Sequence, residues 1–290
     1  MSLFSKLFGT NGDKVNRKLD KKKIAEDEFF EEEYIKALIK KYKRTATLLR
    51  PQKSETPLEQ AKSKFGGIPN FENFESYPTC TSCDSPLNFV LQFYKKDFPT
   101  FYFPDDKNLF QLFRCPNNDC PDQNTQHSDR KMSHYYSNAV KENNKILDKP
   151  TYILKDAEKE VPDCNLTPKI IEDFPNFDDF EDSDFANIEE DFGNDMSEAF
   201  MDKYAAVNGP KFNGYPSYTQ SPVYPQCLCG KTKEFFFQLS SDDREEGINY
   251  QPPSDIWSAH GIMIGDLGNI YYYVCKSCGE KSIESNWDCY

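Results

Sequence analysis

Ten cysteines are the residues of this 290-residue chain whose type and spacing could do chemistry. Eight of them form four close pairs: Cys80 with Cys83, Cys115 with Cys120, Cys227 with Cys229, and Cys275 with Cys278. A structural zinc ion takes four tetrahedral ligands, and two such pairs supply them when folding brings them together. The sequence therefore predicts two four-cysteine zinc sites, one from the first four paired cysteines and one from the last four, with two Zn²⁺ per chain.

The two sites leave different alternatives open. The second has a tight C-x-C pair, so a cluster of buried reduced thiols is its alternative. Disulfides are disfavoured at both, because the N-terminus lacks the apolar core of a secretory signal and the compartment is then reducing. We expect the ligands to be paired within each half, although a duplicated fold could exchange them between halves. Cys164 and Cys289 are expected to be unligated.

An enzyme is not expected. Four cysteine ligands fill the coordination sphere of zinc and leave no position for water or substrate, which makes the metal structural. The three histidines, His127, His134 and His260, are not spaced as a helical metal pair, and no nucleophile elbow, P-loop or zinc-protease motif occurs. We therefore predict no catalytic and no cofactor-binding residues beyond the metal ligands.

The elements that must position the cysteines are short aromatic strands. Residues 86–94, 108–114, 234–239 and 269–274 read as strands bounded by turn residues. Antiparallel ribbons of this kind, placed between the cysteine pairs, would bring both pairs of one half to the same end. Residues 133–149 could form a short helix.

An internal repeat indicates a duplication. KFGGIPNFENFESYPTC at 64–80 matches KFNGYPSYTQSPVYPQC at 211–227. The positions Lys64, Phe65, Gly67, Pro69, Tyr77, Pro78 and Cys80 correspond to Lys211, Phe212, Gly214, Pro216, Tyr224, Pro225 and Cys227. The sequence thus predicts that the chain is an internal duplication, with residues 156–203 in the connection between its halves.

The expected organisation has four parts. Residues 1–44 hold a basic leader, about 1–20, and an amphipathic helix whose apolar spacing runs from Lys21 to about Leu49. Residues 45–155 and 204–290 are the two repeats, each with a zinc site. Residues 156–203 form an acidic connection with spaced phenylalanines. This connection reads either as a solvated linker or as an arm that grips a basic client or folds back over the sheets.

The net charge of the chain indicates which classes of partner it can bind. The net charge is −13, which disfavours direct binding to nucleic acid or to an anionic membrane and suits a basic protein. No run of apolar residues is long enough for a transmembrane helix. We expect a cytoplasmic protein, with the nucleus, cilium or mitochondrion as alternatives.

Two groups of motifs carry a family resemblance. KFGGIP in the first half, with NGYPSYTQ, FFFQLSSD and GDLGNIYYYVC in the second, resembles the bacterial YwqG-like domain. CTSCDSPLNFVLQFY followed by LFQLFRCPNNDC resembles the eukaryotic programmed cell death protein 2 branch of the same (TYPP) superfamily. The resemblance covers about residues 45–155 and 205–290.

The resemblance implies an internally duplicated α+β fold with mostly antiparallel sheets. In the eukaryotic branch it also implies a dedicated chaperone for a basic small-subunit ribosomal protein, acting in ribosome biogenesis. We therefore expect a zinc-stabilised, non-enzymatic protein-binding module, a chaperone or adaptor for a basic protein. The alternative is a structural subunit of a large ciliary or organellar assembly.

Overall fold

The computed structural model describes residues 24–121, 132–139, 145–154, 157–242 and 258–290. The basic leader and His127 lie outside these residues. The chain divides into two compact units, one from the residues up to Leu38 together with Glu181–Lys203, the other from Ile39–Phe180 together with Tyr204–Tyr290. The first unit thus combines part of the expected N-terminal segment, 1–44, with part of the acidic connection, 156–203.

The first unit is helical. Its helices are α1 (Glu26–Glu31), the start of α2 (Glu33–Tyr42), α3 (Asp182–Asp191) and α4 (Asn194–Lys203). Aromatic rings form its centre: the Phe29 ring lies 5.2 Å from that of Phe192, and the Lys203 ammonium lies 3.6 Å from the centroid of Phe30. Two phenylalanines of the acidic sequence, Phe185 on α3 and Phe200 on α4, are buried in this unit.

The N-terminal helix differs from the expectation in extent. Instead of one helix from Lys21 to Leu49, the chain forms α1 and α2, separated by Glu32 in an extended conformation (φ −61°, ψ 136°). The next element is a strand, β1 (Arg44–Lys53). Residues 44–49 carry two β-branched threonines and pair with β6, and residues 46–48 also pair with β7, so tertiary pairing overrides the helical spacing there.

The second unit contains one mostly antiparallel sheet with the order β10-β9-β8-β7-β1-β6-β2-β3-β4-β5. Besides β1, the strands are β2 (Lys64–Phe65), β3 (Asn88–Tyr94), β4 (Leu109–Arg114), β5 (Met132–Ser137), β6 (Cys164–Asp173), β7 (Lys211–Asn213), β8 (Glu234–Ser240), β9 (Asn269–Val274) and β10 (Glu284–Asp288). Two short 3₁₀ helices, η1 (Phe177–Asp179) and η2 (Gly279–Ser282), complete it. The α+β class with a mostly antiparallel sheet is thus confirmed.

The four predicted strands are confirmed as β3, β4, β8 and β9. The short helix expected within 133–149 is wrong, because Met132–Ser137 is a strand that pairs with β4 along its whole length. Tyr135 and Tyr136 pack beside the aromatic core, and that burial outweighs the local preference.

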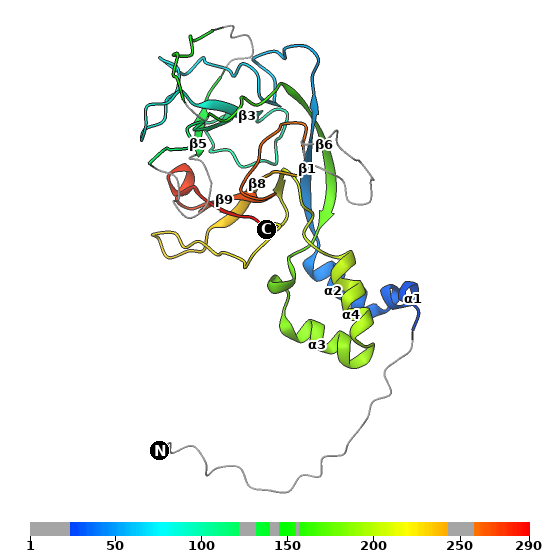
Figure 1. Cartoon of the computed structure of the whole chain (residues 1–290). Coiled ribbons are helices and arrows are strands. Elements are labelled where there is room, and N and C mark those ends of the chain that lie inside the picture. Colours follow the sequence, from blue (N-terminus) through cyan, green and yellow to red (C-terminus); the bar gives the residue numbers. More distant parts are fainter. Residues whose placement is uncertain (1–23, 122–131, 140–144, 155–156, 243–257) are drawn as a thin grey trace, which may run out of the picture. The chain divides into compact units, whose positions relative to one another are not determined.

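The acidic connection supplies a central strand rather than only a linker. Its residues 164–173 form β6, which pairs with β1 over ten residues from Arg44↔Asp173 to Lys53↔Cys164. These two long strands lie side by side and join the two halves of the sheet (Figure 1).

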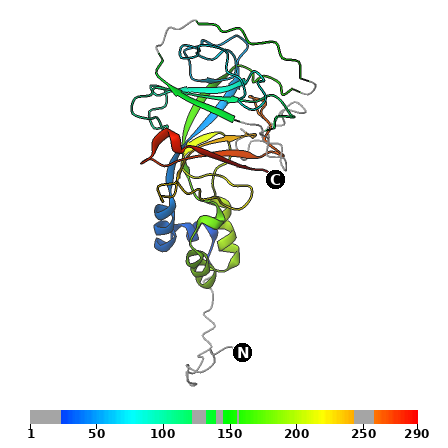
Figure 2. The ribbon, with the colours of Figure 1, turned by 90° about the vertical axis from the view of Figure 1, so that its left-hand side faces the viewer.

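The sheet bends so that its halves share one core. Phe93 on β3 and Phe237 on β8 lie far apart in strand order, yet their ring centroids are 5.7 Å apart. Phe101 also contacts Phe110 of the first half and Phe212 of the second, at 5.1 and 5.6 Å. Figure 2 shows the two groups of strands facing each other. The halves therefore stabilise each other through a common aromatic core.

His260 lies in this core as a neutral ring. It is stacked on Phe65 at 4.9 Å, and its Nδ1 accepts a hydrogen bond from the Ile262 backbone at 3.1 Å. Burial lowers the pKa of His260 to about 3.

This histidine is expected to make folding sensitive to acid. In the unfolded chain His260 titrates near its ordinary value, about 6.5, so below that pH the unfolded state binds the extra proton and gains stability. The His260 contribution should therefore lower the free energy of unfolding by about 2 kcal/mol between pH 7 and pH 5. Urea denaturation of wild type and His260→Asn at both pH values measures it. An identical pH dependence in the two proteins would contradict the assignment.

Candidate metal centres

The first group of four cysteines is built by the two ends of a hairpin. Cys80 and Cys83 precede β3, while Cys115 and Cys120 follow β4, and antiparallel pairing of these strands brings both loops to one edge. The Cys80 loop is closed by two backbone bonds, Cys80 N–H to Ser85 O at 2.8 Å and Asp84 N–H to Cys80 O at 2.9 Å. Asp84 takes a positive φ of 57°, which turns the chain around the pair.

The sulfur positions suit a tetrahedral ion. Cys80 Sγ lies 3.7 Å from Cys120 Sγ, and Cys83 Sγ lies 3.6 Å from Cys115 Sγ. All four sulfurs lie within 4.8 Å of one another. A Zn–S bond of about 2.3 Å gives a tetrahedron with S–S edges of about 3.8 Å. The group therefore has the dimensions that four thiolates adopt around zinc.

The environment of this first group is apolar. Cys80, Cys115 and Cys120 are buried with Leu87, Phe89 and Phe113. Burial raises the pKa of Cys83, but hydrogen bonds with Ser85 and Asn117 outweigh it and lower the pKa to about 6. A thiolate is thus available at neutral pH to start metal binding.

The second group repeats the arrangement with β8 and β9. Cys227 and Cys229 precede β8, and Cys275 and Cys278 follow β9. Cys229 Sγ lies 3.6 Å from Cys275 Sγ, and the four sulfurs again lie within 4.8 Å of one another. The tight C-x-C turn is possible because Gly230 has φ +84° and donates its N–H to Cys227 O at 2.8 Å.

The second group is more open to solvent. Cys227 and Cys275 are buried, but Cys229 and Cys278 are exposed. The pKa of Cys229 is lowered to about 7, chiefly because its sulfur accepts a hydrogen bond from the Lys231 backbone N–H. The two groups therefore have similar sulfur–sulfur distances, but the cysteines of the second group are more exposed to solvent.

The structure brings together the eight predicted cysteines as two groups of four, each within one half. All ten cysteines lie in the described part of the chain, and none of them forms a disulfide. Cys164 is outside both groups; it is buried, and its thiol donates to Pro162 O and Ala259 O at 3.4 Å. Cys289, also outside them, is half-buried. Two groups able to hold metal are thus present, as predicted.

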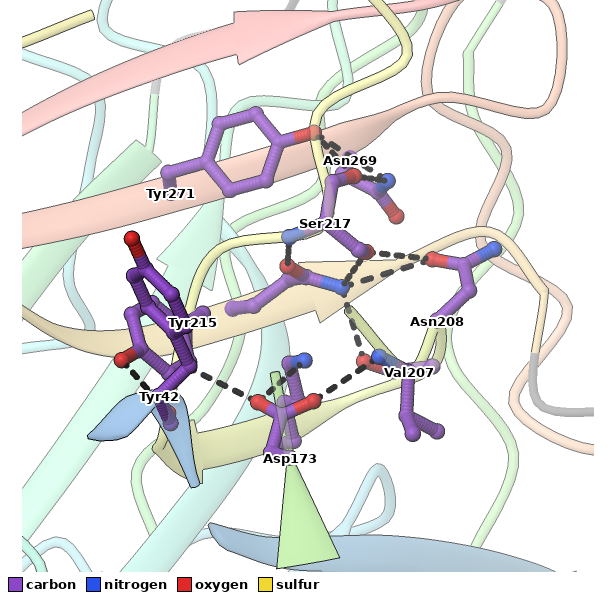
Figure 3. Close-up of polar contacts among 11 residues, drawn as sticks. Tyr42, Asp173, Val207, Asn208, Tyr215, Ser217, Asn269 and Tyr271 are labelled. Carbon is purple, nitrogen blue, oxygen red and sulfur yellow. Dashed lines mark hydrogen bonds and ion pairs between the residues drawn. The ribbon is translucent and has the colours of Figure 1, made fainter. Parts of the chain in front are cut away.

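A buried polar network supports the second half and was not predicted (Figure 3). Asp173, at the end of β6, accepts hydrogen bonds at 2.8 Å from Lys211 Nζ and from the backbone N–H groups of Val207 and Tyr215. The side chains of Lys211 and Asp173 are both 0% exposed. Burial lowers the pKa of Lys211, although Asp173 opposes this shift.

The first half has a looser counterpart of this pair. Lys64 Nζ lies 3.7 Å from Asp163, whose side chain is 21% exposed. Asp163 directly precedes β6 and Asp173 is its last residue, so the two carboxylates that meet the buried lysines flank one strand. The repeated Lys-Phe dipeptide was the only sequence signal for these pairs, and it does not reveal that the lysines are buried.

Further contacts recur at corresponding positions. Gln92 Oε1 accepts from Asn70 N–H at 3.0 Å, and Gln238 Oε1 accepts from Ser217 N–H at 2.9 Å. The pairing register also shifts between Phe89 and Leu91 in one hairpin and between Phe235 and Phe237 in the other. The two halves therefore share local construction as well as sequence motifs.

Two further observations concern the character of the helices and the similarity of the chain to known proteins. Among the described residues, no helix has the length and apolar character needed to cross a membrane. A search of curated proteins finds no match to the chain. A family model described as a domain of unknown function, DUF1963, matches residues 63–278, about three quarters of the chain and all eight paired cysteines. The chain therefore belongs to the DUF1963 family.

Proposed function

We propose that the protein is a non-enzymatic, zinc-stabilised interaction module that acts as a chaperone or adaptor for a basic, ribosomal-type protein. The observation that carries the proposal is the pair of four-cysteine groups. Four thiolates close the coordination sphere of zinc, so the metal would fasten loops and leave no open position for chemistry. A rigid sheet fastened in this way suits binding better than catalysis.

Zinc is the metal we propose, two ions per chain. Four cysteines and S–S separations of 3.6–3.7 Å favour tetrahedral zinc over the oxygen-preferring calcium and magnesium. Each ion would join the loop before one strand of a hairpin to the loop after the other. Cys80 and Cys115 would hold the first half together in this way, and Cys227 and Cys275 the second.

We also propose that the chain is an internal duplication of the YwqG-like kind, related to the programmed cell death protein 2 branch. The matched glutamine contacts, the matched register shifts and the two cysteine groups support this. The resemblance is what suggests a ribosomal client and a cytoplasmic place of action.

Charge supports a basic client. Residues 24–38 and 181–203, which make up the described part of the helical unit, contain fifteen Asp or Glu and two Lys. Such a unit attracts a basic protein and speeds the encounter, an effect that salt weakens.

Affinity purification of the full chain from its native source tests the proposal. The expected result is a small, stoichiometric complex with one basic ribosomal protein, identified by mass spectrometry and rebuilt from the purified components. The rebuilt complex should weaken steeply as salt is raised from about 50 to about 500 mM, by about tenfold or more. A stable megadalton assembly would favour the structural-subunit alternative, and purification without any basic partner would refute the client proposal.

A further inference from the structure

The second group of four cysteines contains two residues that solvent reaches and two that it does not. Cys229 and Cys278 are exposed, whereas Cys227 and Cys275 are buried. The exposed pair is divided between the two loops, because Cys229 precedes β8 and Cys278 follows β9. Leu228, next to Cys229, is fully exposed, so this loop stands in solvent. A small oxidant therefore meets one cysteine on each loop.

The two buried cysteines are held by their backbones. Cys227 donates its N–H to Lys231 O at 2.8 Å. Cys275 donates its N–H to the Ser282 hydroxyl at 2.9 Å. Both residues are thus fixed below the surface, and the exposed pair is the one that reacts first.

The turns that carry the exposed cysteines have space beside them. Each of these cysteines is followed by a glycine with a positive φ, Gly230 at +84° and Gly279 at +67°. Among the described residues other than the chain neighbours, no atom lies within 4 Å of the point where a Cβ of Gly230 would stand, and only the Tyr102 hydroxyl, at 3.9 Å, approaches that of Gly279. Both turns can therefore shift without a clash at these points.

The exposed sulfurs are also close enough to join. All four sulfurs of the group lie within 4.8 Å of one another, and a disulfide bond is about 2.05 Å long, so Cys229 and Cys278 need to approach by at most about 3 Å. A contact independent of the metal keeps the loops adjacent, because Lys231 Nζ donates to Ser277 Oγ at 2.7 Å.

The first group lacks this arrangement. Cys83 is half-buried, and the other three cysteines are buried. They belong to an apolar cluster with Leu87, Phe89 and Phe113. The first group therefore presents no exposed pair of sulfurs and serves as an internal control.

We propose that the second group is an oxidation site, at which a hydroperoxide converts Cys229 and Cys278 into a disulfide and the zinc ion is released. The Cys229 thiolate attacks the peroxide, the O–O bond breaks, and Cys229 becomes a sulfenic acid as hydroxide leaves. The Cys278 thiolate then attacks the Cys229 sulfur, the S–O bond breaks, and a second hydroxide leaves. One peroxide thus takes two electrons from two thiolates.

The reaction exchanges one cross-link for another. Cys227 and Cys275 alone are too few to complete a tetrahedral zinc site, but the new disulfide joins the same two loops. The hairpin between them also keeps its place in the core through Phe237, Ile270 and Tyr272. The second half should therefore stay folded when its zinc leaves. The inference rests on the zinc binding that we propose above.

Hydrogen peroxide added to the full-length, zinc-loaded protein tests the proposal. A zinc-sensitive dye should report loss of one of the two ions, about tenfold faster than any loss of the other. Peptide mapping after denaturation and alkylation should find Cys229 joined to Cys278, with the four cysteines of the first group reduced. Circular dichroism should stay unchanged, and a phosphine reductant with added zinc should restore the second ion.

Two variants test the order of the steps. Cys278→Ser removes the second sulfur, so dimedone should trap Cys229 as a sulfenic acid, a readout that does not depend on how much zinc this variant retains. Cys289→Ser is the control, because Cys289 lies outside both groups, and it should form the Cys229–Cys278 disulfide at the wild-type rate.

The possible failures are distinguishable. Zinc-loaded protein that keeps both ions in peroxide, loses both at one rate, or forms a different disulfide would overturn the oxidation site and leave the zinc proposal standing. Absence of dimedone-labelled Cys229 in Cys278→Ser would likewise overturn it. Protein purified from its native source without zinc would refute both proposals.

Discussion

Chelation is expected to release two zinc ions from the purified protein, one quickly and one slowly. The fast ion should come from the second group, because Cys229 and Cys278 are exposed, whereas the first group is enclosed by Leu87, Phe89 and Phe113. Loss of the slow ion should unfold the first half, because structural zinc contributes about 10–16 kcal/mol of apparent binding free energy. Elemental mass spectrometry gives the stoichiometry, a zinc-sensitive dye gives the two rates, and circular dichroism follows unfolding.

Single substitutions assign the two ions. Cys229→Ser should remove the fast ion and leave one zinc per chain, whereas Cys115→Ser should remove the slow ion and lower the melting temperature far more. Cys289→Ser is the control, because Cys289 lies outside both groups, and it should keep both ions. Two ions released at one rate, or a protein purified without zinc, would contradict the expectation.

Asp173→Ala should cost about 3–5 kcal/mol of folding free energy, the usual cost of leaving a buried charge without its partner. The substitution strands the Lys211 ammonium at 0% exposure and also removes the acceptor of the Val207 and Tyr215 N–H groups. Urea denaturation with saturating zinc measures the loss, so that any change in metal occupancy does not contribute.

Asp163→Ala, directly before β6, is the matched comparison. Lys64 lies 3.7 Å from Asp163 and also donates to Leu58 O at 3.2 Å, so this lysine keeps a partner when the carboxylate is removed. The expected loss is about 1–3 kcal/mol, clearly less than for Asp173→Ala. Both lysines are fully buried, so equal losses at the two positions would show that the bond from Lys64 to Leu58 O does not lower the cost, and would contradict the expectation.

The sequence by itself determined the metal groups and the hairpins that carry them. Cysteine pairs a few residues apart must share one loop, and aromatic strands between two pairs place both loops at one edge, so local spacing was enough. The strands β3, β4, β8 and β9 were likewise visible as aromatic runs between turns.

The tertiary structure alone decided the role of the acidic connection. In β6 only Cys164 and Asp173, at its two ends, are buried; the residues between them are exposed or half-buried, so the strand has no apolar alternation for the sequence to reveal. Its stability comes from backbone pairing with β1, a partner more than a hundred residues away. The burial of Lys211 and the bend that brings Phe93 to Phe237 were hidden for the same reason. Each depends on which distant segment lies alongside, and local composition does not encode that.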